Sequence, residues 1–159
     1  MKRFLFSVLL FWIFVSALSA QSTIVIVRHA EKAKSGGDNP ELSDAGHVRA
    51  EALAKMLKDS GITTIYATEF KRTQETAAPL AKALGITVSI VPSKNTPELA
   101  SKLHNQTGNS LVVGHGNTIP DLIAAFGIAT PINIAEGDYD NLFIVVLDEK
   151  PRLIRLHYH

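Results

Sequence analysis

The chain has 159 residues, of which 46% are hydrophobic and 19% are charged, a composition typical of one globular domain rather than of a disordered chain. Sixteen Lys and Arg residues against 15 Asp and Glu residues give a formal net charge of +1, and no run of like charges indicates nucleic-acid binding. Because the chain has no cysteine, it has no disulfide, Cys-ligated metal site or thiol nucleophile, and covalent catalysis would need Ser, Thr, His, Lys or a carboxylate.

Residues 1–20 have the three-part layout of a cleavable secretory signal peptide. Two basic residues precede an apolar run, residues 4–15, and small residues follow this run up to Ala20. The run is shorter than the ~20 residues of a membrane-spanning helix, which disfavours a permanent anchor. We therefore expect cleavage near Ala20, a single domain over residues 21–159, a secreted or periplasmic location, and no stable membrane association after cleavage.

Beyond this segment, short β-branched apolar runs alternate with amphipathic segments. Strands are predicted at residues 23–27, 64–67, 87–91 and 110–113, and helices at residues 44–59, 71–84, 98–104 and 118–126. Two further strands are predicted at residues 142–147 and 153–157. Ser43 suits the N-cap of the first helix, and Gly85 suits the end of the second. The alternation predicts an α/β fold, a three-layer αβα sandwich whose mainly parallel sheet has antiparallel strands at one edge.

Arginine and histidine side chains follow three of these strands. Arg28 and His29 follow the first strand, Arg72 lies at the start of the helix after the second, and His115 follows the fourth. Ligands of open α/β sheets bind outside the carboxyl ends of the strands, so the four side chains should meet at one edge. Guanidinium groups match phosphoryl oxygens, and a neutral imidazole can attack phosphorus to form a phosphohistidine. The pattern therefore predicts a phosphoryl site.

Other site types have weaker support. The remaining histidines lack a position after a strand and are assigned to the surface or to helix ends: His47, His104, His157 and His159. A histidine-based metal site is disfavoured because the two arginines would repel a cation. Residues 114–119 approach a dinucleotide-binding motif but lack its third glycine.

Four segments, in this order, resemble the motifs of the histidine phosphatase superfamily, the phosphoglycerate mutase-like group. They are residues 27–31 (Val-Arg-His-Ala-Glu), 42–50, 72–77 (Arg-Thr-Gln-Glu-Thr-Ala) and 113–118 (Val-Gly-His-Gly-Asn-Thr). The resemblance spans residues 24–118 and implies a phosphoglycerate mutase-like fold for the predicted sandwich.

The resemblance also implies a role for each site residue. His29 would be the nucleophile that becomes phosphorylated. Arg28 and Arg72 would hold the phosphoryl oxygens. His115 would complete the pocket, together with the backbone N–H of Gly116. No metal ion or other cofactor is needed for this scheme.

The acid that protonates the leaving group is less well defined by the sequence. The family's acidic residue usually follows the third strand, where Glu98 is the only candidate, although Glu98 equally suits a carboxylate in the first turn of a helix. Asp121 is another candidate at the pocket edge, where a helix N-terminal role is favoured. Ala30 replaces the glycine usual in the family and adds a methyl group near the pocket. Residues 139–141 could line the same edge, although a turn is the simpler interpretation.

Together these observations predict a metal-independent phosphomonoester hydrolase of the histidine acid phosphatase type, which acts through a phosphohistidine on His29. Its substrate would be a small-molecule or phosphoprotein phosphate ester, bound in a shallow pocket because the loop over residues 32–42 is short. Two alternatives remain: a non-catalytic phosphate- or phospho-ligand-binding module, and a phosphoglycerate mutase-type phosphotransferase. The predicted signal peptide favours a hydrolase over a cytoplasmic mutase.

Overall fold

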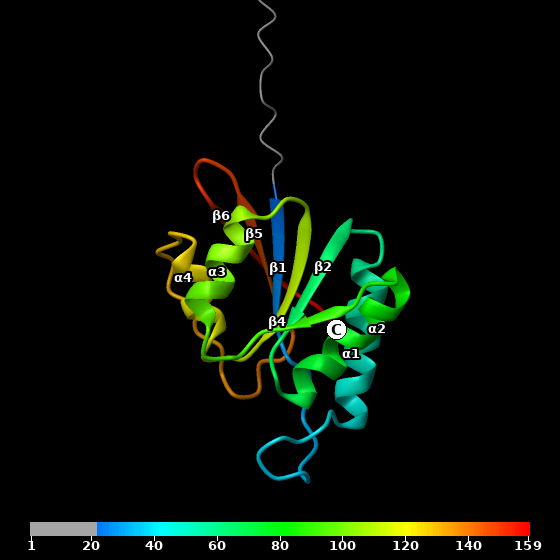
Figure 1. The fold of residues 1–159 in the computed structure, drawn as a ribbon. Helices are drawn as coiled ribbons and strands as arrows, with labels where there is room; N and C mark the ends of the chain where they lie inside the picture. The colour runs from blue at the N-terminus through cyan, green and yellow to red at the C-terminus, as the bar shows by residue number, and fades with distance from the viewer. Residues whose placement is uncertain (1–21) are drawn as a thin grey trace, which may run out of the picture.

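The computed structural model describes residues 22–159, so the expected signal peptide lies outside the described residues. Within them, six strands form one sheet in the order β3-β2-β4-β1-β5-β6 (Figure 1). The strands are β1 (Ser22–Arg28), β2 (Ile62–Ala67), β3 (Val88–Ile90), β4 (Asn109–Gly114), β5 (Asn141–Leu147) and β6 (Arg152–His157). The helices are α1 (Asp44–Leu57), α2 (Lys71–Leu84), α3 (Thr96–Asn105) and α4 (Ile119–Ala125).

The sheet is mixed, with β1 near its centre. Strand β1 pairs in parallel with β4, where Val27 lies opposite Val113, and antiparallel with β5, where Val27 lies opposite Leu142. Strands β2 and β3 continue the parallel part, and β6 pairs antiparallel with β5. The predicted mainly parallel sheet with antiparallel strands at one edge is therefore confirmed.

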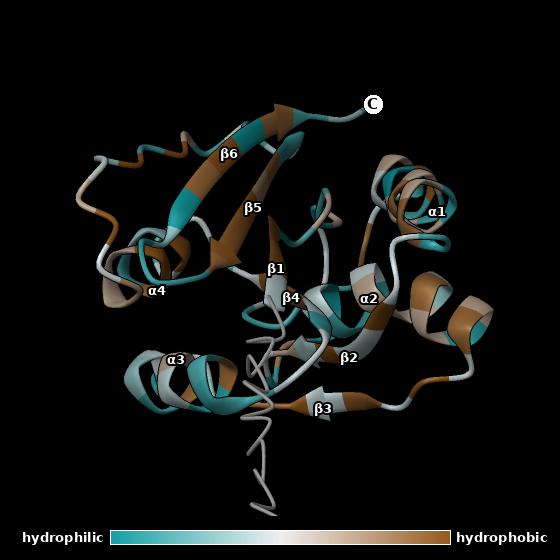
Figure 2. Ribbon diagram, turned by 90° about the horizontal axis from the view of Figure 1, so that it is seen from above, coloured by the Kyte–Doolittle hydropathy of each residue, from teal (hydrophilic) through white to brown (hydrophobic). Residues whose placement is uncertain are grey.

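Helices cover both faces of the sheet, with α1 and α2 on one face and α3 and α4 on the other (Figure 2). Successive side chains of β1 point to opposite faces, as the pleat requires. Val25 and Val27 belong to the core under α1 and α2, whereas Ile24 and Ile26 belong to the core under α3 and α4. Burial on both faces explains why this strand is a continuous apolar run instead of an alternating one.

The ends of the elements have local causes. Ser43 caps α1, because its hydroxyl accepts a hydrogen bond from the backbone N–H of Gly46 at 3.2 Å. Gly85 ends α2 in a left-handed conformation with φ of 67°. Helix α3 begins two residues before the predicted start, with Pro97 in its first turn, where the missing N–H of proline has no intrahelical partner to lose.

The carboxyl-terminal residues join the sheet to the layer of α1. The backbone N–H of Tyr158 donates to the carbonyl oxygen of Asp140 at 2.9 Å, and its ring is buried in the core with Leu53 of α1. The carbonyl oxygen of Tyr158 accepts a hydrogen bond from Arg49 Nη1 at 3.1 Å. Among the helices of residues 22–159, none has the length and apolar character needed to cross a lipid bilayer.

Candidate active site

An open, polar pocket lies at the carboxyl ends of β1 and β4. Its lining combines the four residues predicted to meet there with residues from two later segments of the chain. The pocket is lined by Arg28, His29, Lys32, Arg72, His115, Gly116, Asn117, Ile134 and Glu136. The structure thus brings together the predicted arginines and histidines, and Gly116 lies with them.

His29 is held in one orientation by its own neighbours. Its backbone N–H donates to the carbonyl oxygen of Gly114 at 2.9 Å, and its ring Nδ1 lies 2.8 Å from the carbonyl oxygen of Ala30. A carbonyl oxygen only accepts hydrogen bonds, so Nδ1 carries the proton and Nε2 keeps a free lone pair. Burial is the main cause that lowers the pKa of His29 to about 4. The ring is therefore neutral, and nucleophilic at Nε2, at neutral pH.

A chain of threonine hydroxyls orients His115. The Thr73 hydroxyl lies 2.7 Å from the carbonyl oxygen of Phe70, to which it donates, and 2.9 Å from the Thr68 hydroxyl. With the Thr73 proton used in this way, Thr68 donates to Thr73. Thr68 then accepts a hydrogen bond from Nε2 of His115, at 2.9 Å.

This arrangement leaves Nδ1 of His115 free of the threonine chain. Burial, followed by the charge of Arg72, lowers the pKa of His115 to about 4. The ring centroids of His29 and His115 are 5.4 Å apart. Neither Thr68, just after β2, nor Thr73, in the first turn of α2, was predicted as a site residue, because a threonine at such a position gives no distinctive sequence signal.

The two arginines differ in what holds them. Arg28 Nη1 donates to the carbonyl oxygens of Ala135 at 2.8 Å and Glu136 at 2.7 Å. The guanidinium carbon of Arg72 lies 4.4 Å from the ring centroid of Phe70. The Nε atoms of both arginines are buried and have no hydrogen-bond partner within residues 22–159. Buried donors of this kind are costly unless an acceptor is present, and the oxygens of a bound anion would provide acceptors.

Residues 131–140, which we call the strap, form one wall of the pocket. In Figure 1 this orange segment passes below the carboxyl ends of β1 and β4, before β5 begins. Within the strap, Tyr139 lies against the site: the Arg28 guanidinium carbon is 4.4 Å from its ring centroid, and the His29 ring is 6.0 Å away. The turn favoured for residues 139–141 is wrong, because residues 139 and 140 form no turn and β5 begins at Asn141. Long-range contacts with Arg28 place Tyr139, and a local sequence pattern does not reveal them.

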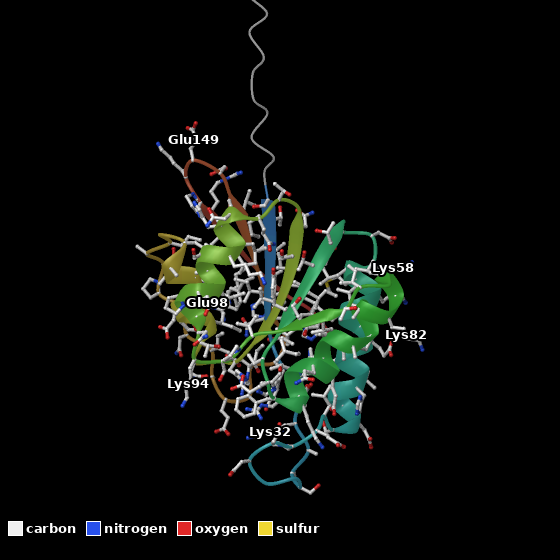
Figure 3. The ribbon with its side chains drawn as sticks, viewed as in Figure 1. Lys32, Lys58, Lys82, Lys94, Glu98 and Glu149 are labelled. Atoms are coloured by element: carbon white, nitrogen blue, oxygen red, sulfur yellow. The ribbon has the colours of Figure 1, made fainter. Side chains whose placement is uncertain are left out.

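The structure does not bring Glu98 into this pocket. Glu98 accepts a hydrogen bond from the side chain of Asn95 at 3.0 Å and lines a different cavity, beside Lys102. In Figure 3 it lies on α3, well apart from Lys32, which lines the pocket at the ends of β1 and β4. Asp121 lines a third cavity with Lys94. The expectation that the segment after the third strand supplies a pocket carboxylate is corrected, because α3 directs Glu98 elsewhere.

Two other carboxylates near the site are already engaged. Glu31 makes a two-point ion pair with Arg49, whose closest N–O distance is 2.6 Å. Burial opposes the ionisation of Glu31, but these hydrogen bonds outweigh it and hold its pKa below the usual value. Both oxygens of Glu69 accept from Ser93, at 2.8 and 2.9 Å. Burial also opposes the ionisation of Glu69, and backbone and Ser93 hydrogen bonds still lower its pKa.

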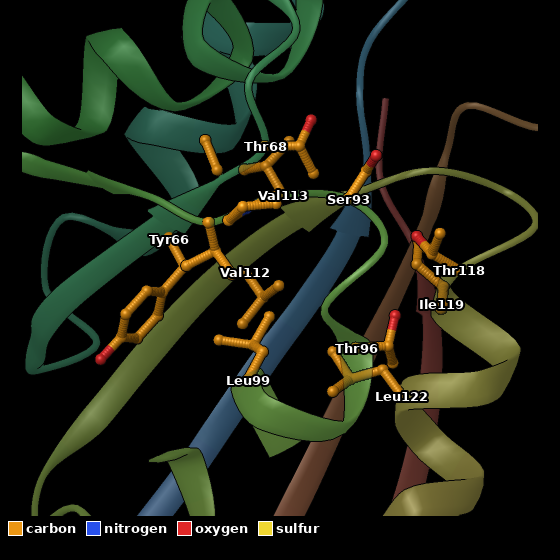
Figure 4. Close-up of a pocket in the computed structure, with 14 residues that line it drawn as sticks. Tyr66, Thr68, Ser93, Thr96, Leu99, Val112, Val113, Thr118, Ile119 and Leu122 are labelled. Carbon is orange, nitrogen blue, oxygen red and sulfur yellow. The ribbon is translucent and has the colours of Figure 1, made fainter. Parts of the chain in front are cut away.

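A second cavity lies between the sheet and the helices α3 and α4. It has about 390 Å³ of space, including a part open to solvent, and no charged side chain lines it. Figure 4 shows the hydroxyls of Thr68 and Ser93 at one end and the apolar side chains of Leu99 and Val112 farther in. No charged side chain in this cavity could pair with an anion, whereas two arginines line the first pocket. Residues 22–159 contain no group of three or more His, Asp or Glu side chains placed to bind a metal ion.

Comparison with known proteins connects this geometry to a family. The family model described as histidine phosphatase superfamily (branch 1) matches residues 24–100. Among characterised relatives, the 8-oxo-(d)GTP phosphatase of Mycolicibacterium smegmatis is 28% identical over 116 residues, which cover 64% of this chain and 36% of that protein. This chain therefore spans about a third of the length of that relative.

Solved structures share the fold. The protein histidine phosphatase SixA, complexed with tungstate, has a TM-score of 0.70 at 18% identity, over 85% of this chain and 96% of that one. A mycobacterial glucosyl-3-phosphoglycerate phosphatase has a TM-score of 0.65 at 15% identity, over 87% of this chain and 98% of that one. At such identities these likenesses establish the phosphoglycerate mutase-like fold that the sequence motifs predicted.

Proposed function

Since the chain belongs to the histidine phosphatase superfamily, we propose that its pocket hydrolyses phosphate monoesters through a phosphohistidine formed on His29. The observation that carries the proposal is the free lone pair of His29 Nε2 in a pocket that holds two arginines with unpartnered Nε donors. A neutral nucleophile beside donors aimed at an anion is the arrangement that phosphoryl transfer needs.

The reaction would proceed in two steps. His29 Nε2 attacks phosphorus, the P–N bond forms, and the bond to the leaving oxygen breaks, with its electron pair going to that oxygen, which takes up a proton. Water then attacks the phosphohistidine, the P–N bond breaks, and inorganic phosphate leaves. Throughout, the carbonyl oxygen of Ala30 accepts from Nδ1–H and supports the positive charge that the ring acquires.

Catalysis in this scheme is mainly electrostatic. Arg28 and Arg72 would bind the non-bridging oxygens, and His115, whose Nε2 is engaged by Thr68, would line the pocket beside them. No step requires a metal ion. The low pKa values of the two histidines, both about 4, would keep the nucleophile neutral in mildly acidic solution, which supports the finer proposal of a histidine acid phosphatase type.

The substrate class and location are also proposals. The similar proteins named above act on a nucleotide, a phosphohistidine protein or a glucosyl phosphoglycerate according to their names, so we propose only a small-molecule or phosphoprotein phosphate ester. The signal-like composition of residues 1–20 supports a secreted or periplasmic enzyme. Amino-terminal sequencing of the exported protein would test this location, and retention of Met1 would contradict it.

The activity is tested by hydrolysis of p-nitrophenyl phosphate in the presence of EDTA. We expect turnover in the unmodified protein and none in His29→Ala, whereas His47→Ala, which removes an exposed histidine of α1, should retain full activity. Intact-mass measurement of rapidly quenched protein should show one added phosphoryl group that is missing from His29→Ala. Phosphate binding without turnover would instead support the binding module, and transfer to a phosphoglycerate without hydrolysis would support the mutase.

A further inference from the structure

We propose that Glu136, on the strap, is the general acid that donates a proton to the leaving-group oxygen. This inference rests on the proposed phosphatase function and identifies the proton donor that the reaction needs. The segment after β3 does not supply one, because Glu98 lines a separate cavity.

Glu136 is the only carboxylate among the described residues that line the phosphoryl pocket. Glu136 is exposed and shares this lining with His29 and His115, which places the residue beside the space that an ester would occupy. General acid catalysis requires a donor within hydrogen-bond reach of the leaving oxygen, and Glu136 alone among the acidic residues of the described part of the chain lines this pocket.

The backbone of Glu136 is held at the site by the same arginine that is proposed to bind the phosphoryl group. Arg28 Nη1 donates to the carbonyl oxygens of Ala135 and Glu136, and the side chain of Asp138 closes the turn by accepting from the backbone N–H of Ala135 at 3.0 Å. A group that must transfer a proton needs such a fixed base, because small displacements reduce the efficiency of transfer.

The carboxyl group itself is free to act. Within residues 22–159 it makes no hydrogen bond or ion pair, whereas the other nearby carboxylates are engaged: Glu31 by Arg49 and Glu69 by Ser93. After donation, the carboxylate could remove a proton from the water that attacks the phosphohistidine, which restores the starting state.

The test compares esters whose leaving groups differ in their need for a proton. The p-nitrophenolate ion leaves without protonation, whereas an alkoxide does not, so Glu136→Gln should lower kcat/KM for an alkyl phosphate by about 10²- to 10³-fold and change that for p-nitrophenyl phosphate by less than about threefold. Glu98→Gln, the matched control on α3, should leave both values unchanged. The melting temperature of each variant shows whether it folds.

Several results would overturn the proposal. An equal loss on both esters would show a binding or structural role. A leaving-group-dependent loss in Lys32→Gln but not in Glu136→Gln would assign the proton to Lys32, which also lines the pocket. An unmodified protein that hydrolyses neither ester would overturn the phosphatase function as well. Normal alkyl ester hydrolysis by Glu136→Gln would overturn only the role of Glu136.

Discussion

At the scale of single residues, the two pocket arginines have different structural roles. Arg28 connects the strap to β1 through hydrogen bonds of its Nη1 to three strap carbonyls, the longest at 3.5 Å, and it stacks on Tyr139. Arg72 contacts the ring of Phe70, and no hydrogen bond holds its guanidinium within residues 22–159. Arg28 thus has a long-range structural role in addition to its proposed binding role, whereas Arg72 has only the proposed binding role.

Substitution of each arginine by alanine should separate these roles. For Arg72→Ala, kcat/KM for p-nitrophenyl phosphate should fall by about 10²- to 10³-fold, the usual effect of removing one donor to a developing charge, with little change in melting temperature. Arg28→Ala should lose at least as much activity and should also melt at a lower temperature, because the strap loses its anchor. Thermal unfolding measured beside the kinetics checks this, and equal melting temperatures for the two variants would contradict the anchoring role.

At the scale of elements, the first turn of α1 supports the loop that carries the nucleophile. The carbonyl oxygen of Glu31 accepts hydrogen bonds from the backbone N–H and the hydroxyl of Ser43, at 2.9 and 3.2 Å. The helix approaches this carbonyl so closely that a Cβ atom built on Gly46 would lie 2.2 Å from its oxygen. Packing against Glu31, which lies two residues after His29, therefore requires glycine at position 46.

Gly46→Ala should push α1 and the nucleophile loop apart. The free energy of unfolding should fall by about 1 to 3 kcal/mol, as in other overpacked sites, and kcat should fall with it because His29 is displaced. Urea unfolding and steady-state kinetics measure the two effects. Gly137→Ala is the matched control, since an added Cβ there meets no atom within 4 Å, and a similar loss in both variants would show that the close approach to Glu31 is not the cause.

At the scale of the whole molecule, the site makes stability depend on pH. His29 and His115 are both buried, at 4% and 7% exposure, and burial is the largest cause of their lowered pKa values. In the unfolded chain both would titrate near 6.5, whereas in the folded protein they titrate at about 4. Below pH 6.5 the unfolded chain therefore binds protons that the folded protein does not, and the folded state loses stability as the pH falls toward 4.

The free energy of unfolding should thus be lower at pH 5 than at pH 7, as measured by urea unfolding at each pH. In a double variant, His29→Gln with His115→Gln, this difference should shrink because neither position can take up a proton. A double variant of exposed histidines, His47→Gln with His104→Gln, should keep it. An unchanged difference in the first double variant would show that other groups control the acid sensitivity.

The sequence alone was enough to predict the strands and helices, their arrangement in three layers and the proximity of the four site residues. Periodicity and helix-end signals are local features of the sequence. The apolar run of residues 23–27 indicates a strand that is buried on both faces, and Ser43 and Gly85 indicate the helix ends at which they lie. Because ligands bind at the carboxyl ends of strands, the positions of Arg28, His29 and His115 after their strands then suffice to predict that they lie together.

Only the tertiary structure decided how the pocket is completed. The strap wall depends on a bond between Arg28 and a carbonyl 107 residues later, and the orientation of His115 depends on Thr68, 47 residues earlier. Neither strap backbone nor threonine hydroxyls carry a periodic signal, so no local pattern indicates them. The prediction for Glu98 failed for the same reason. Its position along the chain is typical of the family's acidic residue, but α3 directs it into a different cavity, and Glu136 lines the pocket instead. Side chains far apart in sequence meet through the packing of whole elements, and that packing is a property of the folded chain.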